Sequence, residues 1–444
     1  MNASQRERLA RAILERSSAD QCEVAIAASD NALTRFTHES VHQNVAQNDV
    51  SVSIRAIVDG RTGVALSNDA GSEAALHATL QRAIAMAKIA PQDPNQPSLP
   101  AAGVVTTPTG AYDEPTARAA ASVRAHMADA MFEVAERDGL WSAGFASTGA
   151  DGITIANSNG ALASFDGTDA RVNVKMNAPD ASGFAEGLSN TIAGIDAATI
   201  AQTAARKALD TRAPRRVKPG AWTVILEPAA FAELLDYIIG HFSAQSFDEG
   251  SSFFSEGLGE KYFGENVTIR DDFTHALAPS MPFDFEGQPK ARVNLVENGV
   301  VRSIVTDSYW AAKLHRENSG HALPAPNAYG PQALNVVVEP GTKSREELIA
   351  QTPRGLLVSR FWYIRTVDEK QTIVTGMTRD GTYLIEGGEL VGGVRNLRFN
   401  QSILEALRHC EFSSQLRRSG SYSYSMVVPT AKIERFTFTS TTEF

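Results

Sequence analysis

The stretch VSVSIRAIVDGRTGVAL, residues 50–66, alternates apolar side chains with polar or small ones on both sides of Asp59-Gly60. Alternation with a period of two is typical of a strand that buries one face. Asp-Gly between two such runs is a strong signal for a two-residue hairpin turn. The run CEVAIAAS at residues 22–29 alternates in the same way. Together these runs predict an antiparallel sheet near the N-terminus.

Helices are predicted around these strands in the first half of the chain. Apolar spacing and end signals place them at residues 4–16, 72–89, 115–138 and 196–210. Residues 140–188 have the pattern of strands, with Asp151-Gly152 and Asn159-Gly160 as predicted hairpin turns. The expected arrangement is a layer of helices on an antiparallel sheet, which belongs to the α+β class.

The segment TRAPRRVKPG, residues 211–220, is the best candidate for a domain boundary, because it combines two prolines with four cations. We therefore expect an N-terminal domain at residues 1–212, a linker at 213–220 and a C-terminal domain at 221–444. The second half opens with a predicted strand at 221–228 and a helix at about 229–241. The rest reads as β-rich with few helices, one of them at about 401–409. Its predicted turns are Glu286-Gly287, Asn298-Gly299, Asp380-Gly381 and Glu386-Gly387-Gly388.

Composition limits the classes of function. The 444 residues are 43% hydrophobic and 21% charged, as in a soluble globular protein of two or three domains. The net charge of −10 comes without a basic stripe, which argues against nucleic acid as a partner. The cluster Arg212, Arg215, Arg216 and Lys218 is interpreted as a solvated linker. No apolar run approaches the roughly 20 residues of a membrane span, and the charged N-terminus lacks the apolar core of a signal peptide. We expect a cytoplasmic protein with no membrane partner.

Few residues suggest metal or nucleophile chemistry. HESVH at residues 38–42 fits the zinc-protease pattern H-E-x-x-H, but it lies between predicted strands and not on a helix. We interpret it as a polar strand or loop edge. Cys22 and Cys410 are too far apart in sequence to indicate a disulfide framework and are expected to be reduced. The pair His409-Cys410 is not a nucleophile–base pair by adjacency alone.

Two neighbouring segments in the second half are candidates for a cleft. DYIIGH, residues 236–241, places Asp236 and His241 near one helix end, but a carboxylate and an imidazole are too few for a catalytic zinc, which needs three protein ligands. His241 is equally compatible with an ordinary helix-end histidine. The following stretch SFDEGSSFFSEGLGE, residues 246–260, is compatible with either a flexible substrate loop or a plain surface loop.

Several stretches, in their order along the chain, resemble the TldD/PmbA family. They are SVSIRAIVDGRTGVALSND (51–69), SSFFSEGLGEKYFGENVTIRDD (251–272), VNLVENGVVRSIVTDSYWAAKL (293–314), ALNVVVEPGTKSREELIAQTPRGLLV (333–358) and PTAKIERFTF (429–438). The resemblance covers nearly the whole chain. It implies two domains, a cytoplasmic location and a dimeric proteolytic particle with an internal chamber.

The resemblance also implies a role for the chain. Catalytic TldD-type members bind zinc through H-E-x-x-x-H and a downstream cysteine, and they cleave unfolded or small peptides that add as a strand to a sheet edge. Here Asp236 and Tyr237 stand where the first histidine and the glutamate are expected, followed by His241 at the last position. The downstream stretch 413–425 contains no cysteine. This is similar to the PmbA/TldE branch, which implies no metal site in this chain and zinc in a TldD-type partner.

Our leading hypothesis is therefore a TldE-like subunit that helps to hold peptide substrate, paired with a TldD-type catalytic subunit or with itself. Catalytic residues are not identified. Candidate residues of a substrate cleft are Asp236, Tyr237, His241, Ser251, Ser252 and Phe253. One alternative is a self-sufficient peptidase in which Asp236, His241 and Cys410 converge. Another is a regulatory binding protein, in line with the family's label as a modulator of DNA gyrase.

Overall fold

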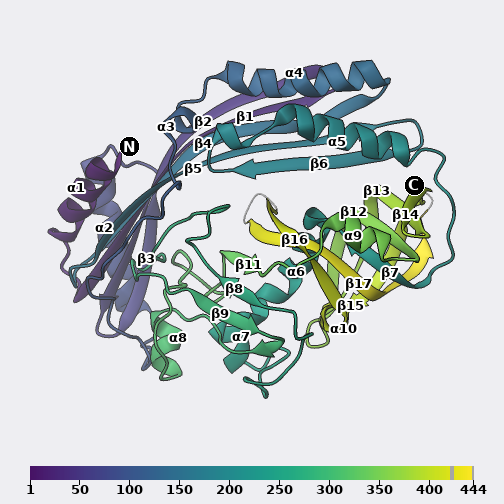
Figure 1. Cartoon of the computed structure of the whole chain (residues 1–444). Coiled ribbons are helices and arrows are strands. Elements are labelled where there is room, and N and C mark those ends of the chain that lie inside the picture. The colour runs from purple at the N-terminus through teal and green to yellow at the C-terminus, as the bar shows by residue number, and fades with distance from the viewer. Residues whose placement is uncertain (421–424, 443–444) are drawn as a thin grey trace.

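The computed structural model describes residues 1–420 and 425–442, which form a helix-covered sheet followed by a strand-rich half (Figure 1). The N-terminal half contains α1 (Ala3–Leu14), β1 (Gln21–Thr37), β2 (Ser40–Val58), β3 (Arg61–Ser67), α2 (Glu73–Ile89), α3 (Glu114–Ala117), α4 (Ala121–Asp138), β4 (Trp141–Asn157), β5 (Leu162–Asn177), β6 (Ser182–Ser189), the short 3-10 helix η1 (Ile192–Gly194) and α5 (Ala197–Asp210). This arrangement confirms the α+β class.

The N-terminal sheet is antiparallel throughout, in the order β3-β2-β1-β4-β5-β6. On β1, β2, β4 and β5 the even-numbered side chains, such as Val24, Ile54 and Val174, are buried under the helices, and on β3 and β6 the register places odd-numbered residues on this face. Helices α1 and α2 cover one end of this face, and α4 and α5 cover the other. Because side chains alternate along a strand, the odd-numbered residues of β1, β2, β4 and β5 lie on the opposite face. This face of the sheet is turned toward the C-terminal half (Figure 1).

Two predicted hairpin turns are wrong, each for a local packing reason. Asp151-Gly152 lies inside β4, where a Cβ on Gly152 would come within 2.3 Å of Arg6 Nη1. The glycine thus makes room for the buried Arg6 guanidinium, and the strand continues. Asp380-Gly381 lies inside β13, where the two residues form a bulge opposite Ser359. Asn159-Gly160, in contrast, lies between β4 and β5, as predicted.

The single helix expected at residues 115–138 is also wrong, because it is broken into α3 and α4. The Asp113 carboxylate caps α3 by accepting a hydrogen bond from the Thr116 backbone N–H at 3.0 Å. The Thr116 hydroxyl in turn accepts from the Ile192 N–H at 2.8 Å. These bonds hold the short helix beside the start of η1, and α4 begins separately at Ala121.

The C-terminal half is built around strands. It contains β7 (Gly220–Leu226), α6 (Pro228–Ile239), the 3-10 helix η2 (Gly240–Phe242), α7 (Ala244–Asp248), β8 (Ile269–Asp271), β9 (Val293–Glu297), β10 (Val300–Val301), α8 (Ser308–Lys313), β11 (Val336–Val338), α9 (Arg345–Ala350), β12 (Arg354–Asp368), β13 (Ile373–Glu386), β14 (Glu389–Gly393), β15 (Leu397–Ser402), α10 (Ile403–Arg408), β16 (Cys410–Ser419) and β17 (Met426–Thr441).

Five of these strands close into a ring. β17 pairs with β15, β15 with β13, β13 with β12, β12 with β7, and β7 again with β17. The aromatic rings of Phe361, Phe399 and Phe436 meet in its core, with centroids 4.7–5.7 Å apart. Helix α6 packs on β12 and β17, while β11, β8 and β9 extend the sheet toward the N-terminal half. The segment 211–220 joins the two halves, and its four cationic residues are exposed.

One buried ion cluster ties the N-terminal sheet to the second half. The guanidinium of Arg55 on β2 contacts Glu23 of β1 at 2.7 Å and Glu286 at 3.0 Å. Glu286 belongs to a tight loop in which the Asp284 carboxylate accepts hydrogen bonds from three backbone N–H groups. Burial raises the pKa of the Glu23 carboxyl, and the charge of Arg55 opposes that rise. The Arg55 guanidinium is therefore the counter-charge of two buried carboxyl groups in this cluster.

Replacing Arg55 by Met should lower the free energy of unfolding at pH 7 by about 3–5 kcal/mol, because two buried carboxylates lose their counter-charge. Chemical denaturation would measure the change. Without Arg55 the Glu23 pKa rises further, so the folded variant binds more protons than its unfolded form. The decrease in the free energy of unfolding caused by the substitution should therefore become smaller as the pH falls from 8 to 5.

A matched control is Arg16→Met, since Arg16 pairs with Glu73 where both side chains are largely exposed. That substitution should cost less than about 1 kcal/mol. Equal losses for the two variants would show that the Arg55 cluster does not hold the halves together.

Candidate functional site

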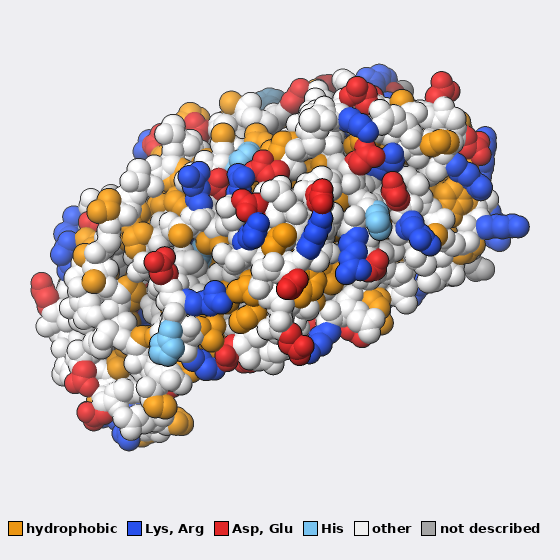
Figure 2. All heavy atoms as spheres, turned by 60° about the horizontal axis from the view of Figure 1, so that its bottom comes forward, with side chains coloured by type: hydrophobic (Ala, Val, Ile, Leu, Met, Phe, Trp, Pro, Cys, Tyr) orange, Lys and Arg blue, Asp and Glu red, His pale blue; other side chains and the backbone are white. Residues whose placement is uncertain are grey.

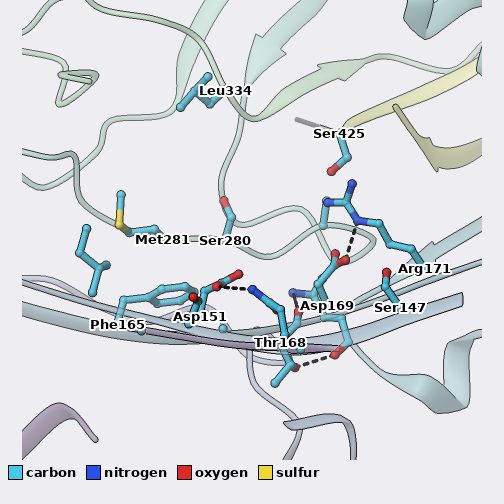
Figure 3. Close-up of a pocket in the computed structure, with 18 of the residues that line it drawn as sticks. Ser147, Asp151, Phe165, Thr168, Asp169, Arg171, Ser280, Met281, Leu334 and Ser425 are labelled. Carbon is cyan, nitrogen blue, oxygen red and sulfur yellow. Dashed lines mark hydrogen bonds and ion pairs between the residues drawn. The ribbon is translucent and has the colours of Figure 1, made fainter. Parts of the chain in front are cut away.

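A large cavity, of about 930 Å³, lies between the odd-numbered face of the N-terminal sheet and the C-terminal half (Figure 3). Strands β1, β2, β4 and β5 provide its floor. Residues of the segments 272–290 and 334–337 form the opposite wall, together with Arg418, Ser425 and Val427. The cavity is thus built by both halves of the chain.

The floor is hollow because its side chains are small. Gly149 on β4 and Gly167 on β5 lie among alanines and serines on the cavity face. No Cβ fits at Gly149, because it would come within 1.7 Å of Asn31 Oδ1. The Asn31 side chain lies across this glycine and donates a hydrogen bond to Asp151 Oδ1 at 3.1 Å. A Cβ at Gly167 would likewise come within 2.8 Å of the Phe165 ring, so the two glycines make room for Asn31 and Phe165 at the floor.

The cavity has a polar side and an apolar side. Figure 3 shows Asp169, Arg171 and Ser425 on one side, with Phe165 and Met281 on the other. Asp169 accepts from Arg171 Nε at 2.5 Å and from Arg418 Nη2 at 2.9 Å. Burial lowers the pKa of Arg418, and a nearby Arg171 charge adds to that effect.

The two carboxyls of the floor differ in environment. Asp169 is held by the two guanidiniums, whereas burial raises the pKa of Asp151, which accepts a hydrogen bond from the Asn31 amide. The cavity can therefore offer an extended chain hydrogen-bond donors and acceptors on one side and aromatic and thioether surface on the other.

A second cavity of about 310 Å³ lies at the C-terminal end of α6. Its lining includes Asp236, Tyr237 and His241, so the structure brings together three of the predicted cleft residues. The Tyr237 hydroxyl donates to the Ile364 carbonyl at 2.7 Å. Asp236 is exposed, while His241 is buried, and burial lowers the His241 pKa to about 4. At neutral pH His241 is therefore an uncharged imidazole.

The other three predicted residues lie elsewhere. Phe253 packs its ring against His241 at a centroid distance of 5.2 Å, within an aromatic cluster that includes Phe242 and Phe254. Ser252 is buried and Ser251 donates to the Ser246 carbonyl, and none of the three lines either cavity. The stretch 246–260 thus packs against the His241 ring through Phe253.

The donors present at α6 do not fit a catalytic zinc. In residues 1–420 and 425–442, no three His, Cys, Asp or Glu side chains are grouped closely enough to hold a metal ion. Part of the 413–425 stretch, residues 421–424, lies outside the described residues. Cys410 is buried and does not line the cavity of Asp236 and His241. Burial raises its thiol pKa to about 12, which disfavours the nucleophilic thiolate.

The HESVH segment forms the two-residue turn between β1 and β2. His38 and Glu39 both have positive φ angles, 48° and 53°, and the His38 ring stacks on Trp141. The segment is a strand edge with a turn and not a zinc-binding helix, as its strand-like surroundings predict.

Sequence patterns alone missed the residues of the large cavity. Asn31, Asp151, Asp169 and Arg171 sit at odd positions of their strands, where polar side chains would also suit a solvent-exposed face. The only available signal was the run of glycines at 144, 149, 152 and 167, since glycine inside strands often marks close approach or a ligand.

The surface charge and the helices of the chain also provide information about its partners. Figure 2 shows a face on which Lys and Arg lie interspersed with Asp and Glu, without a continuous basic stripe among the coloured residues. Within the described part of the chain, no helix has the length and apolar character needed to cross a membrane.

Comparison with known proteins gives matches along most of the chain. Residues 22–87 match the profile of the PmbA/TldA metallopeptidase domain 1, and residues 112–212 match that of the central domain. Residues 219–440, half of the chain, match the PmbA/TldA metallopeptidase C-terminal domain.

Individual relatives agree with these profiles. A metalloprotease of Methanothermobacter thermautotrophicus is 30% identical over 202 residues, covering 43% of this chain and 42% of the relative. Metalloprotease MJ0996 of Methanocaldococcus jannaschii is 27% identical over 214 residues, covering 47% of this chain and 46% of the relative. The chain thus matches less than half the length of these two curated relatives.

Among solved structures, TldE from Thermococcus kodakarensis has the same fold. Its TM-score is 0.88 at 21% identity, and the match covers 98% of this chain and 99% of that one. Taken with the three domain profiles, this places the chain in the PmbA/TldD metallopeptidase family.

Proposed function

We propose that this chain is a TldE-like subunit of a TldD/TldE-type metallopeptidase acting on unfolded or small peptides, and that it holds peptide without cleaving it. The observation that carries the proposal is the set of residues at the C-terminal end of α6. By the resemblance to the TldD-type pattern, Asp236 and Tyr237 stand where the first metal-binding histidine and the glutamate base are expected. A metallopeptidase zinc needs three protein ligands, and a glutamate activates its water.

The single imidazole at this site supports the same conclusion. His241 is neutral at pH 7, so it has a lone pair for a metal, but its ring is packed against Phe253. Helix α6 also carries Glu233 and the exposed Asp236, but Glu233 accepts a hydrogen bond from the Phe361 N–H and does not line this cavity. Zinc would then come from a TldD-type partner, where it would activate the water that attacks the peptide bond. This chain's contribution would be to bind and orient the peptide.

The large cavity supports peptide holding. Its floor is a sheet face with small side chains, which leaves room for an extended backbone and for side chains on one side of it. The polar side, with Asp169 and Arg418, offers charged hydrogen-bond partners, and Phe165 and Met281 offer an apolar surface. Binding across a concave, partly apolar site with few polar groups is the common pattern of ligand pockets.

The cytoplasm stays the predicted compartment.

Metal content separates this proposal from a self-sufficient peptidase. Elemental analysis of the purified chain should find no stoichiometric zinc, and the chain should not cleave peptides. After mixing with a TldD-type subunit, zinc and cleavage should both appear. Stoichiometric zinc in the isolated chain would contradict the proposal and would direct attention to Asp236, His241 and Cys410.

The cavity floor can be tested by filling it. Gly167→Leu should raise the KM for peptide cleavage by the mixed enzyme about 10-fold or more, because the new side chain would displace the Phe165 ring and reduce the space for the peptide. The kcat should stay close to that of the unchanged enzyme, since no group near the zinc is altered.

Gly71→Leu is the matched control, because Gly71 is exposed, has no atom other than Asp69 Oδ1 near its Cβ position and lies outside the cavity. Its KM should not change. An unchanged KM for Gly167→Leu, with the same thermal midpoint as the control, would show that the peptide does not use this floor.

A further inference from the structure

One cation in the wall of the large cavity has no counter-charge in contact with it. Lys290 lines the cavity from the loop that follows Asp284 and Glu286, and its side chain is half-buried. Within residues 1–420 and 425–442, its ammonium group makes no hydrogen bond or ion pair. Taking a charge out of water costs free energy unless another charge or hydrogen bonds compensate it. The wall therefore holds a positive charge that a bound ligand could neutralise.

The two carboxyl groups whose charges act on Lys290 are hydrogen-bonded to other groups. Asp271 accepts from the Asn335 backbone N–H at 2.9 Å and from the Asn335 side-chain amide at 3.1 Å. Asp284 accepts from three backbone N–H groups. Burial lowers the pKa of Lys290, and the charges of Asp271 and Asp284 oppose this effect without contacting the ammonium. They favour the protonated amine but leave its three hydrogen-bond donors available to a ligand.

Four acidic side chains also line the cavity, and each of them has another partner or faces solvent. Asp169 contacts Arg171 and Arg418, so this group of two guanidiniums and one carboxylate carries a net charge of +1. An anion that enters the cavity would therefore meet two positive groups, Lys290 and this one. The other three acids are Asp151, which accepts from Asn31, Asp272, which accepts from Thr274, and Asp49, which is exposed.

Lys290 is anchored next to the apolar side of the cavity. Its backbone N–H donates to the Pro282 carbonyl at 2.9 Å, which fixes it beside the segment that carries Met281. Met281 and Phe165 form the apolar side and pack on one hydrophobic cluster with Phe283 (Figure 3). A ligand held at Lys290 would thus place its charged group beside a surface that accepts an apolar side chain.

We propose that Lys290 binds a carboxylate of the peptide held in this cavity, and that Phe165 and Met281 contact the apolar side chain next to it. The site rests on the peptide-holding function proposed above and adds to it the class of peptide. The carboxylate is either the C-terminal group of the peptide or an acidic side chain, since both present the same two oxygens. A hydrogen bond between ammonium and carboxylate is stronger than one between neutral groups, and more so where little water reaches.

Binding of three peptides to the full chain tests the proposal, because both walls of the cavity belong to this chain. The peptides share one apolar sequence and an N-terminal fluorophore. The first has a free C-terminal carboxylate, the second a C-terminal amide, and the third a C-terminal amide and one internal glutamate. Fluorescence anisotropy should show that the first or the third binds about 10-fold more tightly than the second. The one that does identifies the source of the carboxylate.

Substitution of the lysine assigns the preference to one side chain. Lys290→Met should bring the ratio of the dissociation constants close to one, and Lys290→Arg should keep the preference, because a guanidinium also pairs with a carboxylate. Lys218→Met is the matched control, since it removes one positive charge from the exposed linker outside the cavity, and it should leave the ratio unchanged.

The outcomes separate this site from the function on which it rests. Equal affinity of the unchanged chain for all three peptides, or a preference that survives in Lys290→Met, would overturn the carboxylate site and leave the peptide-holding function in place. If Lys290 served only as a counter-charge for Asp271, Lys290→Met would lower the thermal midpoint and weaken all three peptides alike. Failure of every peptide to bind would contradict the peptide-holding function and this site together.

Amine labelling of the unchanged chain gives a measurement that needs no substitution. Acetic anhydride reacts with uncharged amines, and mass spectrometry reads the extent of reaction at each lysine. At equal saturation, the preferred carboxylate peptide should slow labelling of Lys290 more than the plain amide does, because the carboxylate favours the charged amine. Labelling of Lys218 should not change. Equal protection of Lys290 by the two peptides would overturn the proposal, since it would show that the peptide shields the cavity without pairing with the amine.

Discussion

The contact of Arg55 with Glu23 and Glu286 is the interaction on which the site depends. It joins β2 and β1 to the loop at 284–288, so it sets the distance between the cavity floor and its opposite wall. A buried charge cluster adds little net stability compared with apolar packing, but it is intolerant of displacement because each charge needs its partner. That property suits a place where two sheets must keep a gap between them.

The gap is useful because the sheet face beside it carries small side chains. A face of large apolar residues would have packed directly on the C-terminal half and closed the cavity. Gly149 and Gly167 have no side chain that projects from the floor into the cavity. Asn31, Asp169 and Arg418 supply hydrogen-bonded polar groups around it. The same chain carries no matching set of metal ligands in its described residues near α6. In the proposed function, binding of the peptide and its cleavage would therefore be carried out by different subunits.

Local patterns predicted the elements better than the site. Alternation around Asp59-Gly60 and the turn at Asn159-Gly160 depend on neighbouring residues, and both are present in the structure. Asp151-Gly152 has the same turn signal but lies within a strand, because Arg6, far away in sequence, needs the space above the glycine. The cavity could not be predicted for the same reason. Its polar side joins Asp169 to Arg418, and only the tertiary fold brings them together.

The central claim is that this chain holds peptide beside a catalytic partner. The most direct measurement is to map cross-links from a peptide that carries a photoreactive group, bound to the mixed assembly after its zinc has been removed. The account predicts cross-links on this chain at β4 and β5, around Phe165 and Gly167, and at Met281 across the cavity. Cross-links confined to the partner subunit, with none on the cavity floor, would contradict it.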